Sequence, residues 1–563
     1  MRNFYFRKTL MLLMFMPFWA LPSLAQKEVN KWIDQVKKTT PFSQESFVRS
    51  SNGLVVTSEL KKGTVINVDV LKLLDLWQNP RPALVLNLPV NGNALPLTVE
   101  MAQIRLTTSD FKVSASSTFT IIPKNDEGVH YRGVVKGDPE SLVALSIYKN
   151  EVRGFIIDKT GKYEIGKVKK SITEHIFYKV DDLVGSSPFS CSSDNPSLNK
   201  GLRLNESKLR EAASTAGVGC KTVSVYFECD YQMYLDNGAS ASNVSNYVTA
   251  FFNQVATIYQ NENIDIQISE IFVWSTPDPY RGLNSTSSVL QAFNSNKGAN
   301  FNGNLAHFVT TRNLGGGIAY VGTLCTKSFA HAVSMVFNTY ATYPTYSWTV
   351  ECVTHEIGHN IGSNHTQWCG WVRQDGTTGP IDNCVAPEGG CAATGATPTN
   401  GGTIMSYCHL TSTGINFANG FGPLPGNLIR SNVANASCLS ITNTSAAPTG
   451  QQTSNITDNT ATLSWNAVPN GGNYSVEYKK TSATTWTTLG SFTTTSTGLS
   501  GLSAGTGYDW RVKCDCSGYS TTTSFSTTGS TTCSAPINLT SSNVSSTSAN
   551  LTWGAVSGAA NYT

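Results

Sequence analysis

The sequence predicts three kinds of structure in series: a β-rich N-terminal region, a central α/β (α+β) domain with a twisted mixed sheet, and all-β sandwiches at the C-terminus. Residues 222–231 and 264–274 alternate apolar and polar side chains, which is typical of strands. Residues 243–260, between them, place apolar side chains three and four positions apart, as an amphipathic helix does. After residue 441 the chain is rich in Thr, Ser and Asn and repeats itself, which favours sandwich modules.

The N-terminus has the features of a secretory signal peptide, which we assign to residues 1–25. Basic residues within the first eight positions precede an apolar run at 10–21, and Ser23 and Ala25 offer the small side chains of a cleavage site. The run is too short to span a bilayer, which makes a membrane anchor the less favoured interpretation. No other stretch reaches 18 apolar residues. We therefore expect a secreted, extracellular protein without a membrane span.

Composition supports export and gives no argument for nucleic acid as a partner. Of 563 residues 14% are charged, and the formal net charge is only +3. Nine of the 13 cysteines lie between residues 220 and 438, which predicts disulfides in an oxidising compartment, with the pairing left open. No cysteine stands in a CxxC pair, which argues against a cysteine-only zinc site.

The elements before and within the central domain can be placed in order. Residues 26–205 are expected to form a β-rich pro-region, and a basic, helical-looking stretch around 200–210 is the candidate linker where it is cut. Within the central domain, assigned to 217–440, the predicted order is strand, helix, strand, strand, strand and then a helix carrying a histidine motif. A twisted sheet backed by helices fits this order. The four predicted strands cover residues 222–231, 264–274, 307–311 and 318–322.

The motif HEIGHNIGSNH begins at residue 355 and holds three of the eight histidines of the chain. On a helix His355 and His359 are four residues apart, so their imidazoles project from one face and suit Zn²⁺. Gly362 can adopt a left-handed conformation that ends the helix and lets His365 return as the third ligand. Three protein ligands leave a fourth position for water, as a catalytic zinc site requires. A structural or chance occurrence is the alternative.

Glu356 follows the first of these histidines and is expected to act as a general base rather than a ligand. It would take a proton from the zinc-activated water that attacks a scissile carbonyl, and pass it to the leaving amine. The motif thus predicts hydrolysis of peptide bonds.

The pattern HExxHxxGxxH resembles the signature of the metzincin metalloproteases. The resemblance implies a methionine turn beneath the metal, for which TIMSYC at 403–408 supplies Met405; an ordinary core methionine is the alternative. Residues 306–325 and 131–147 resemble the edge strand and the pro-region motif of the reprolysin-like (adamalysin) branch. An extended polypeptide substrate would pair with that edge strand. The residues expected to contact it are Gly317, Ile318, Ala319, Tyr320, Val321 and Gly322.

Two further residues are candidates by resemblance, each with a plainer alternative. Tyr407 is a candidate donor to the oxyanion, although a packed loop tyrosine is the simpler interpretation. Cys191 is a candidate latency thiolate that would occupy the open zinc position, or else a disulfide partner or a surface thiol. The chain also departs from the reprolysin-like pattern, because Thr366 stands where that branch usually has Asp after the third histidine.

The C-terminal repeat is precise: Pro448, Trp465 and Tyr474 recur as Pro536, Trp553 and Tyr562, each 88 positions later. The first copy, at 446–530, resembles a fibronectin type III module, and residues 533–563 resemble the start of a second, incomplete one. Because so few strands cannot bury a sandwich core, we expect the native protein to continue; a disordered tail is the alternative. Such modules would space the protease or bind a surface, a glycan or a protein ligand. The whole chain is thus expected to be a secreted zinc endopeptidase; a non-catalytic adhesin on the same scaffold is the alternative, and a structural Ca²⁺ finds no support in the sequence.

Overall fold

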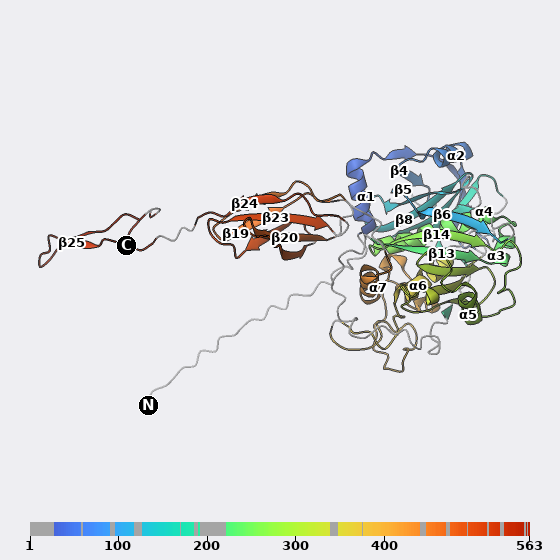
Figure 1. Ribbon diagram of the computed structural model, residues 1–563. Helices are drawn as coiled ribbons and strands as arrows, with labels where there is room; N and C mark the ends of the chain where they lie inside the picture. Colours follow the sequence, from blue (N-terminus) through green and yellow to red (C-terminus); the bar gives the residue numbers. More distant parts are fainter. Residues whose placement is uncertain are drawn as a thin grey trace, which may run out of the picture.

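The computed structural model describes a chain in which the N-terminal and central regions are packed against each other (Figure 1). The predicted signal peptide at 1–25 and the basic stretch around 200–210 lie outside the described residues. The structure describes residues 28–57, 60–90, 96–116, 127–168, 171–184, 190–191, 221–337, 347–373, 375–439, 446–468, 473–492, 494–514, 517–529, 534–556, 559 and 561–563.

The N-terminal region is β-rich, as the sequence predicts. Its ten strands form one sheet in the order β1-β4-β5-β7-β8-β9-β10-β11-β3-β2, mostly through antiparallel pairs. Asp69 caps the helix α2 by accepting from the backbone N–H groups of Leu71 and Lys72. The elements are α1 (Glu28–Thr39), β1 (Ser43–Glu45), β2 (Val48–Val55), β3 (Gly63–Val68), α2 (Val70–Gln78), β4 (Ala83–Leu88), β5 (Leu97–Ile104), β7 (Val129–Val135), β8 (Asp138–Tyr148), β9 (Glu151–Asp158), β10 (Gly161–Lys167) and β11 (Glu174–Lys179).

The central sheet has seven strands in the order β12-β16-β17-β15-β13-β14-β6. It is mixed, because β16 runs antiparallel to β17 while the other pairs are parallel. Both of its outermost strands, β6 and β12, come from the predicted pro-region, so that region shares a sheet with the central domain. The strands are β6 (Thr107–Ala115), β12 (Ser190–Cys191), β13 (Thr222–Cys229), β14 (Asp265–Val273), β15 (Leu305–Thr310), β16 (Gly316–Ala319) and β17 (His331–Met335).

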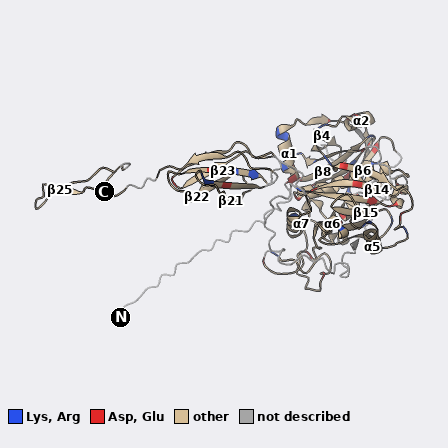
Figure 2. Ribbon diagram, viewed as in Figure 1, with Lys and Arg blue, Asp and Glu red and all other residues tan. Residues whose placement is uncertain are grey.

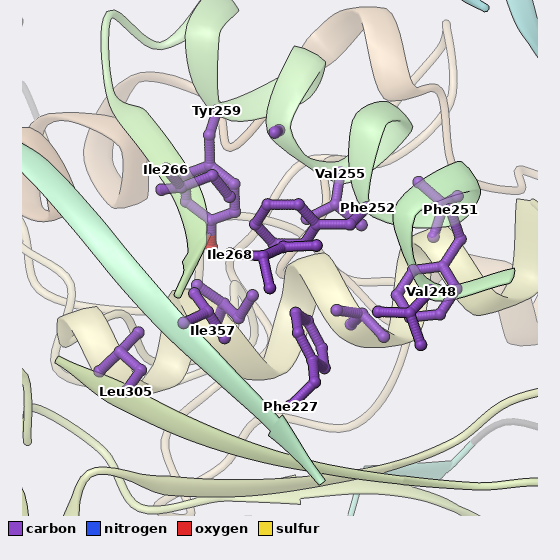
Figure 3. Close-up of a cluster of buried hydrophobic side chains, with 14 of the residues drawn as sticks. Phe227, Val248, Phe251, Phe252, Val255, Tyr259, Ile266, Ile268, Leu305 and Ile357 are labelled. Atoms are coloured by element: carbon purple, nitrogen blue, oxygen red, sulfur yellow. The ribbon is translucent and has the colours of Figure 1, made fainter. Parts of the chain in front are cut away.

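Helix α4 (Ala241–Asn261) is buried along most of its length. It contacts β8 and β9 of the N-terminal sheet on one side, and β14 and the later helix α6 (Ser347–Ile361) on the other. Figure 3 shows its Phe251, Phe252 and Tyr259 meeting Phe227 of β13 and Ile357 of α6 in one cluster. The same buried cluster includes side chains of β7, β8 and β9, so one core joins the two regions.

Buried polar contacts also cross this interface. Arg132 of β7 donates from Nε to Oδ1 of Asn253 at 3.0 Å and from Nη1 to Oε1 of Gln260 at 2.9 Å, both on α4. Glu164 of β10 is 1% exposed. Its carboxylate accepts at 2.5 Å from the backbone N–H of Ser347, which is the first residue of α6. The free N–H groups at the start of a helix need such acceptors. The N-terminal region therefore supports the helix that carries the histidine motif.

The predicted helix and most predicted strands of the central domain are present, but the order has more elements than expected. Helix α5 (Thr286–Lys297) and β17 were not predicted. The predicted strand at 318–322 is wrong in its bounds, because β16 covers Gly316–Ala319. Two further helices, α3 (Tyr231–Asp236) and α7 (Pro423–Asn435), complete this region.

Three disulfides join described cysteines, and all of them lie around the second half of the central domain. They are Cys325–Cys438, Cys369–Cys391 and Cys384–Cys408. The last two close the segment that follows the histidine motif, where short loops replace regular helices and strands. Cross-links of this kind stabilise segments that have little core of their own.

The first C-terminal module is an all-β sandwich. One sheet has the order β18-β19-β22 and the other β21-β20-β23-β24, around a core with Trp465 and Trp510. The Tyr508 hydroxyl accepts from the backbone N–H of Ser503 at 2.9 Å, as a tyrosine corner does. The strands are β18 (Gln452–Ser454), β19 (Thr460–Ser464), β20 (Tyr474–Lys480), β21 (Thr487–Phe492), β22 (Ser496–Ser500), β23 (Gly507–Cys514) and β24 (Thr523–Ser526), followed by the hairpin of β25 (Thr540–Ser542) and β26 (Asn550–Thr552).

Charge is mixed over the molecule. Figure 2 shows basic and acidic residues interspersed along the ribbon, with neither sign forming a continuous stripe in this view. Among the described residues, the helices are all too short or too polar to cross a membrane.

Candidate metal centre

Helix α6 fixes the first two histidines of the motif, and the turn after it brings back the third. Gly362 has a φ of +123°, and its N–H bonds to the carbonyl oxygens of Gly358 and His359 at 3.0 and 2.9 Å. A residue with a Cβ is strained in this conformation, so glycine is the residue that ends the helix here. The chain reverses, and His365 returns toward the face that carries His355 and His359.

The three imidazoles converge on one point. Nε2 of His365 lies 3.0 Å from Nε2 of His359 and 3.1 Å from Nε2 of His355. Three nitrogens of a tetrahedral zinc site with bonds of about 2.0–2.1 Å are spaced by about 3.3–3.4 Å. The two distances from His365 are close to that spacing, and all three side chains are at most 2% exposed. The donor set therefore fits a zinc ion.

The opposite ring nitrogens are each held by an acceptor. Nδ1 of His355 lies 2.7 Å from the carbonyl oxygen of Ile404, and Nδ1 of His359 lies 2.7 Å from that of Ser363. Nδ1 of His365 lies 2.7 Å from Oε1 of Glu388. Each of these oxygens accepts a hydrogen bond from Nδ1–H. The rings are therefore in the tautomer that carries its lone pair on Nε2, the nitrogen at which the three rings meet. Burial also lowers the pKa of His355 far below its usual range, which keeps the ring neutral.

Met405 packs against helix α6. A Cβ added at Gly358 of α6 would press on Sδ of Met405, which is fully buried. The turn is tied to the third histidine through Thr366, whose backbone N–H bonds to the Met405 carbonyl at 3.0 Å and whose hydroxyl lies 3.4 Å from it. Thr366 thus keeps a polar link to the methionine turn at the position where the reprolysin-like pattern has Asp.

Glu356 points from α6 toward β16. A Cβ added at Gly317 would overlap its Oε1, Cδ and Cγ atoms, so the carboxylate lies directly against the backbone of that strand. Glu356 is fully buried and follows His355 in sequence. The arrangement brings together a carboxylate, three imidazoles and a strand backbone.

Tyr407 also lies at the centre. Its ring centroid is 4.7 Å from that of His365 and 6.3 Å from that of His355, and the residue is 7% exposed. It is therefore a wall of the site, which is compatible with both roles that the sequence leaves open for it.

The predicted substrate strand is shorter than expected. Gly317, Ile318 and Ala319 lie in β16, but Tyr320, Val321 and Gly322 do not, which corrects the sequence prediction. The strand ends because the chain turns to bond with the end of α6. The backbone N–H of Gly322 donates to the His359 carbonyl at 2.9 Å, and that of Thr323 to the Asn360 carbonyl at 2.9 Å.

The outer side of β16 carries another strand. β12 pairs with it in parallel, with Ser190 opposite Gly316 and Cys191 opposite Gly317. The backbone of the predicted latency residue is therefore in register with the glycine that contacts Glu356. β16 is capable of accepting an added strand beside the candidate metal centre.

Substituting Gly317 tests how closely Glu356 depends on this strand. In Gly317→Ala, the added methyl group would displace the Glu356 carboxylate, and a displacement near 1 Å can cost about 10²-fold in rate. We expect hydrolysis of a peptide substrate to fall by at least tenfold with zinc content unchanged. Gly282→Ala, where a Cβ meets no atom within 4 Å, is the control. Equal rates in the two variants would contradict the contact described above.

Sequence reasoning missed Glu388, which lies 23 residues after His365 in a loop without a recognisable pattern. A second cluster of metal-binding residue types among the described residues, Asp382, Cys384 and Cys408, has a different explanation. Its two cysteines form a disulfide, which removes the thiolates that would bind a metal.

Comparison with known proteins assigns two parts of the chain. Residues 220–416 match the family model of reprolysin type described as metallo-peptidase family M12, and residues 446–530 match the fibronectin type III domain. The chain is 26% identical over 257 residues to "Disintegrin and metalloproteinase domain-containing protein 9" from Homo sapiens, covering 43% of this chain and 30% of that protein. It is 24% identical over 258 residues to "Zinc metalloproteinase-disintegrin-like" from Cerberus rynchops, covering 44% and 41%.

The chain thus spans less than half the length of the curated relatives that it matches. Among solved structures, one titled "Myokine structure" is 21% identical, with a TM-score of 0.14, and covers 15% of this chain and 97% of that one. The histidine cluster lies inside the first matched segment. The protein therefore contains a reprolysin-type metallopeptidase domain of family M12 at residues 220–416 and a fibronectin type III domain at residues 446–530.

Proposed function

We propose that the protein is a secreted zinc endopeptidase whose metal ligands are His355, His359 and His365. The convergence of three Nε2 atoms, with each Nδ1 held by an acceptor, is the observation that carries the proposal. The M12 match supports zinc and peptide bonds as the chemistry.

The zinc ion, Glu356 and Tyr407 would each have a different role in the proposed hydrolysis. A bound zinc ion would supply a Lewis acid for the attacking water and the scissile carbonyl. Glu356 would accept a proton from that water on a carboxylate oxygen and return it to the amide nitrogen of the leaving chain. Tyr407 is the candidate donor to the carbonyl oxygen as negative charge develops there. Burial of the site strengthens both interactions by excluding water.

The substrate that fits this site is an extended polypeptide. β16 lies against Glu356 through Gly317, so a strand paired with β16 would pass beside the candidate base. Main-chain hydrogen bonds to a strand edge bind polypeptide without regard to most side chains. The fibronectin type III module is proposed to bind a protein, a glycan or a surface.

Latency follows from the position of β12. Because Ser190 and Cys191 pair with β16, this segment of the pro-region would exclude a substrate from the same edge. We propose that the thiolate of Cys191 contributes to this inhibition as a zinc ligand. Proteolysis would then require a cut after Cys191 that releases the segment.

Metal removal tests the proposed function. The protein, secreted and cut after Cys191, is expected to hold one zinc ion per chain and to hydrolyse casein. Dialysis against a zinc chelator should remove both the metal and the activity, and one equivalent of Zn²⁺ should restore them. Metal content is measured by mass spectrometry and hydrolysis by peptide release. A chain with stoichiometric zinc and no hydrolysis would support the adhesin alternative instead, and a chain without zinc would contradict the proposed zinc endopeptidase.

A further inference from the structure

The third histidine differs from the other two in how its ring is held. The rings of His355 and His359 stand on a rigid helix and donate to main-chain carbonyls. His365 lies after the helix, and its Nδ1 is 2.7 Å from a carboxylate oxygen of Glu388. At equal length, an acceptor with negative charge makes a stronger hydrogen bond than a neutral carbonyl does. Among the three rings, this one is held by a side chain from a distant loop.

Glu388 is itself fixed by contacts with the segment that follows His365. Its backbone N–H donates to the Gln367 carbonyl at 2.9 Å, and its carbonyl accepts from the N–H of Cys369 at 2.9 Å. Nε2 of Gln367 donates to Oε1 of Glu388 at 2.6 Å, so the same oxygen receives both Gln367 and His365.

The loop behind Glu388 is closed covalently. The Cys369–Cys391 disulfide joins its two ends, and Gly389 and Gly390 turn the chain just after Glu388 with φ values of +105° and +75°. Residues with a Cβ rarely adopt these conformations. The side chain of Glu388 is 24% exposed, against 2% for His365. The loop therefore places the partly exposed carboxylate of Glu388 against the buried ring of His365.

We propose that Glu388 is a positioning residue that orients His365 and strengthens it as a zinc ligand. This inference rests on the proposed zinc site. A carboxylate that accepts from Nδ1–H fixes the tautomer in which Nε2 carries its lone pair, and it increases the electron density of the ring. The third ligand has no helix to orient it, so the carboxylate performs that task. Loss of such a partner typically costs about 10–100-fold in metal affinity.

Two substitutions separate orientation from charge. Glu388→Gln keeps an oxygen that can accept from Nδ1–H but removes the negative charge, whereas Glu388→Ala removes both. Asp375→Ala is the matched control. Asp375 lies in the same disulfide-closed loop and bonds to the backbone and hydroxyl of Thr377, without contacting a histidine.

The experiment measures the zinc dissociation constant of the full chain by competition with a chromophoric chelator at fixed pH. The visible absorption of the Co²⁺-substituted protein is recorded as a second readout of ligand geometry. We expect the constant to rise about 10–100-fold in Glu388→Ala, less in Glu388→Gln, and not at all in Asp375→Ala. The Co²⁺ spectrum should change in the two Glu388 variants only.

The outcomes are separable. Wild-type zinc affinity and an unchanged Co²⁺ spectrum in both Glu388 variants would overturn the inference while leaving the zinc site intact. If Glu388→Ala does not fold, Glu388→Gln decides, because it keeps the loop contacts. A wild-type chain that binds no zinc would overturn the proposed function itself. That failure is read from the wild-type chain, whereas failure of the present inference is read from the Glu388 variants.

Discussion

Replacing Glu356 by glutamine is expected to lower kcat/KM for peptide hydrolysis by about 10²–10⁴-fold, the usual contribution of a general base. Glutamine has nearly the same shape, so it should keep its place against Gly317, but its amide cannot accept the proton of the attacking water. Zinc content should stay at one ion per chain, because the proposed zinc ligands are His355, His359 and His365 and do not include Glu356.

The matched control is Glu351→Gln, which also neutralises a buried carboxylate on α6. Glu351 lies 3.2 Å from Nδ1 of His409 and is not part of the cluster formed by His355, His359 and His365. Both variants are assayed with a fluorogenic peptide after the cut that follows Cys191, together with metal analysis. Activity in Glu356→Gln equal to that of Glu351→Gln would remove Glu356 from the proposed mechanism.

Asn253 is where the largest effect on stability is expected. From the middle of α4 its amide donates to the carbonyl oxygens of Tyr131 and Leu145 and to the Ser146 hydroxyl, at 3.1–3.3 Å, and accepts from Arg132. Asn253→Ala would leave these buried groups without that partner, and each such group costs about 1–3 kcal/mol. Since these contacts overlap, we expect the free energy of unfolding to fall by about 2–4 kcal/mol.

This loss should appear in both regions at once. Hydrogen–deuterium exchange followed by mass spectrometry should show faster exchange in peptides of β7 and of α4, because the residue joins the two. Asn296→Ala, at an exposed position on α5, is the control and should change stability by no more than about 0.5 kcal/mol. An effect confined to α4, or as small as that of the control, would contradict a shared core.

The convergence of the three histidines was predictable because the pattern that brings them together lies in one short segment of the sequence. The spacing of His355 and His359 needs only the period of a helix, and Gly362 provides the turn that returns His365. Strand β13 and helix α4 were predictable for the same reason, since their apolar periods stand in single segments. Glu388 was not predictable. Its contact with His365 arises from a loop fold and a disulfide, and neither leaves a periodic trace in the sequence.

The sheet edges illustrate a second limit. An alternating segment predicts a strand but not its neighbour, because any strand offers the same backbone groups for pairing. The placement of β6 beside β14, and of β12 beside β16, joins segments more than 120 residues apart in the chain. The end of β16 shows the same limit. The sequence from Ile318 to Gly322 predicts a strand, yet the Gly322 N–H group donates to the carbonyl oxygen of His359 near the end of α6.

The insertion of β6 into the central sheet changes what maturation would mean for this protein. The proposed cut, placed between residues 192 and 220, would sever the backbone but would leave β6 hydrogen-bonded to β14 and α4 in contact with β8 and β9. The severed piece would remain as a permanent subunit, and the mature enzyme would be a two-chain complex. Only the short stretch around β12 would need to move away for a substrate to enter.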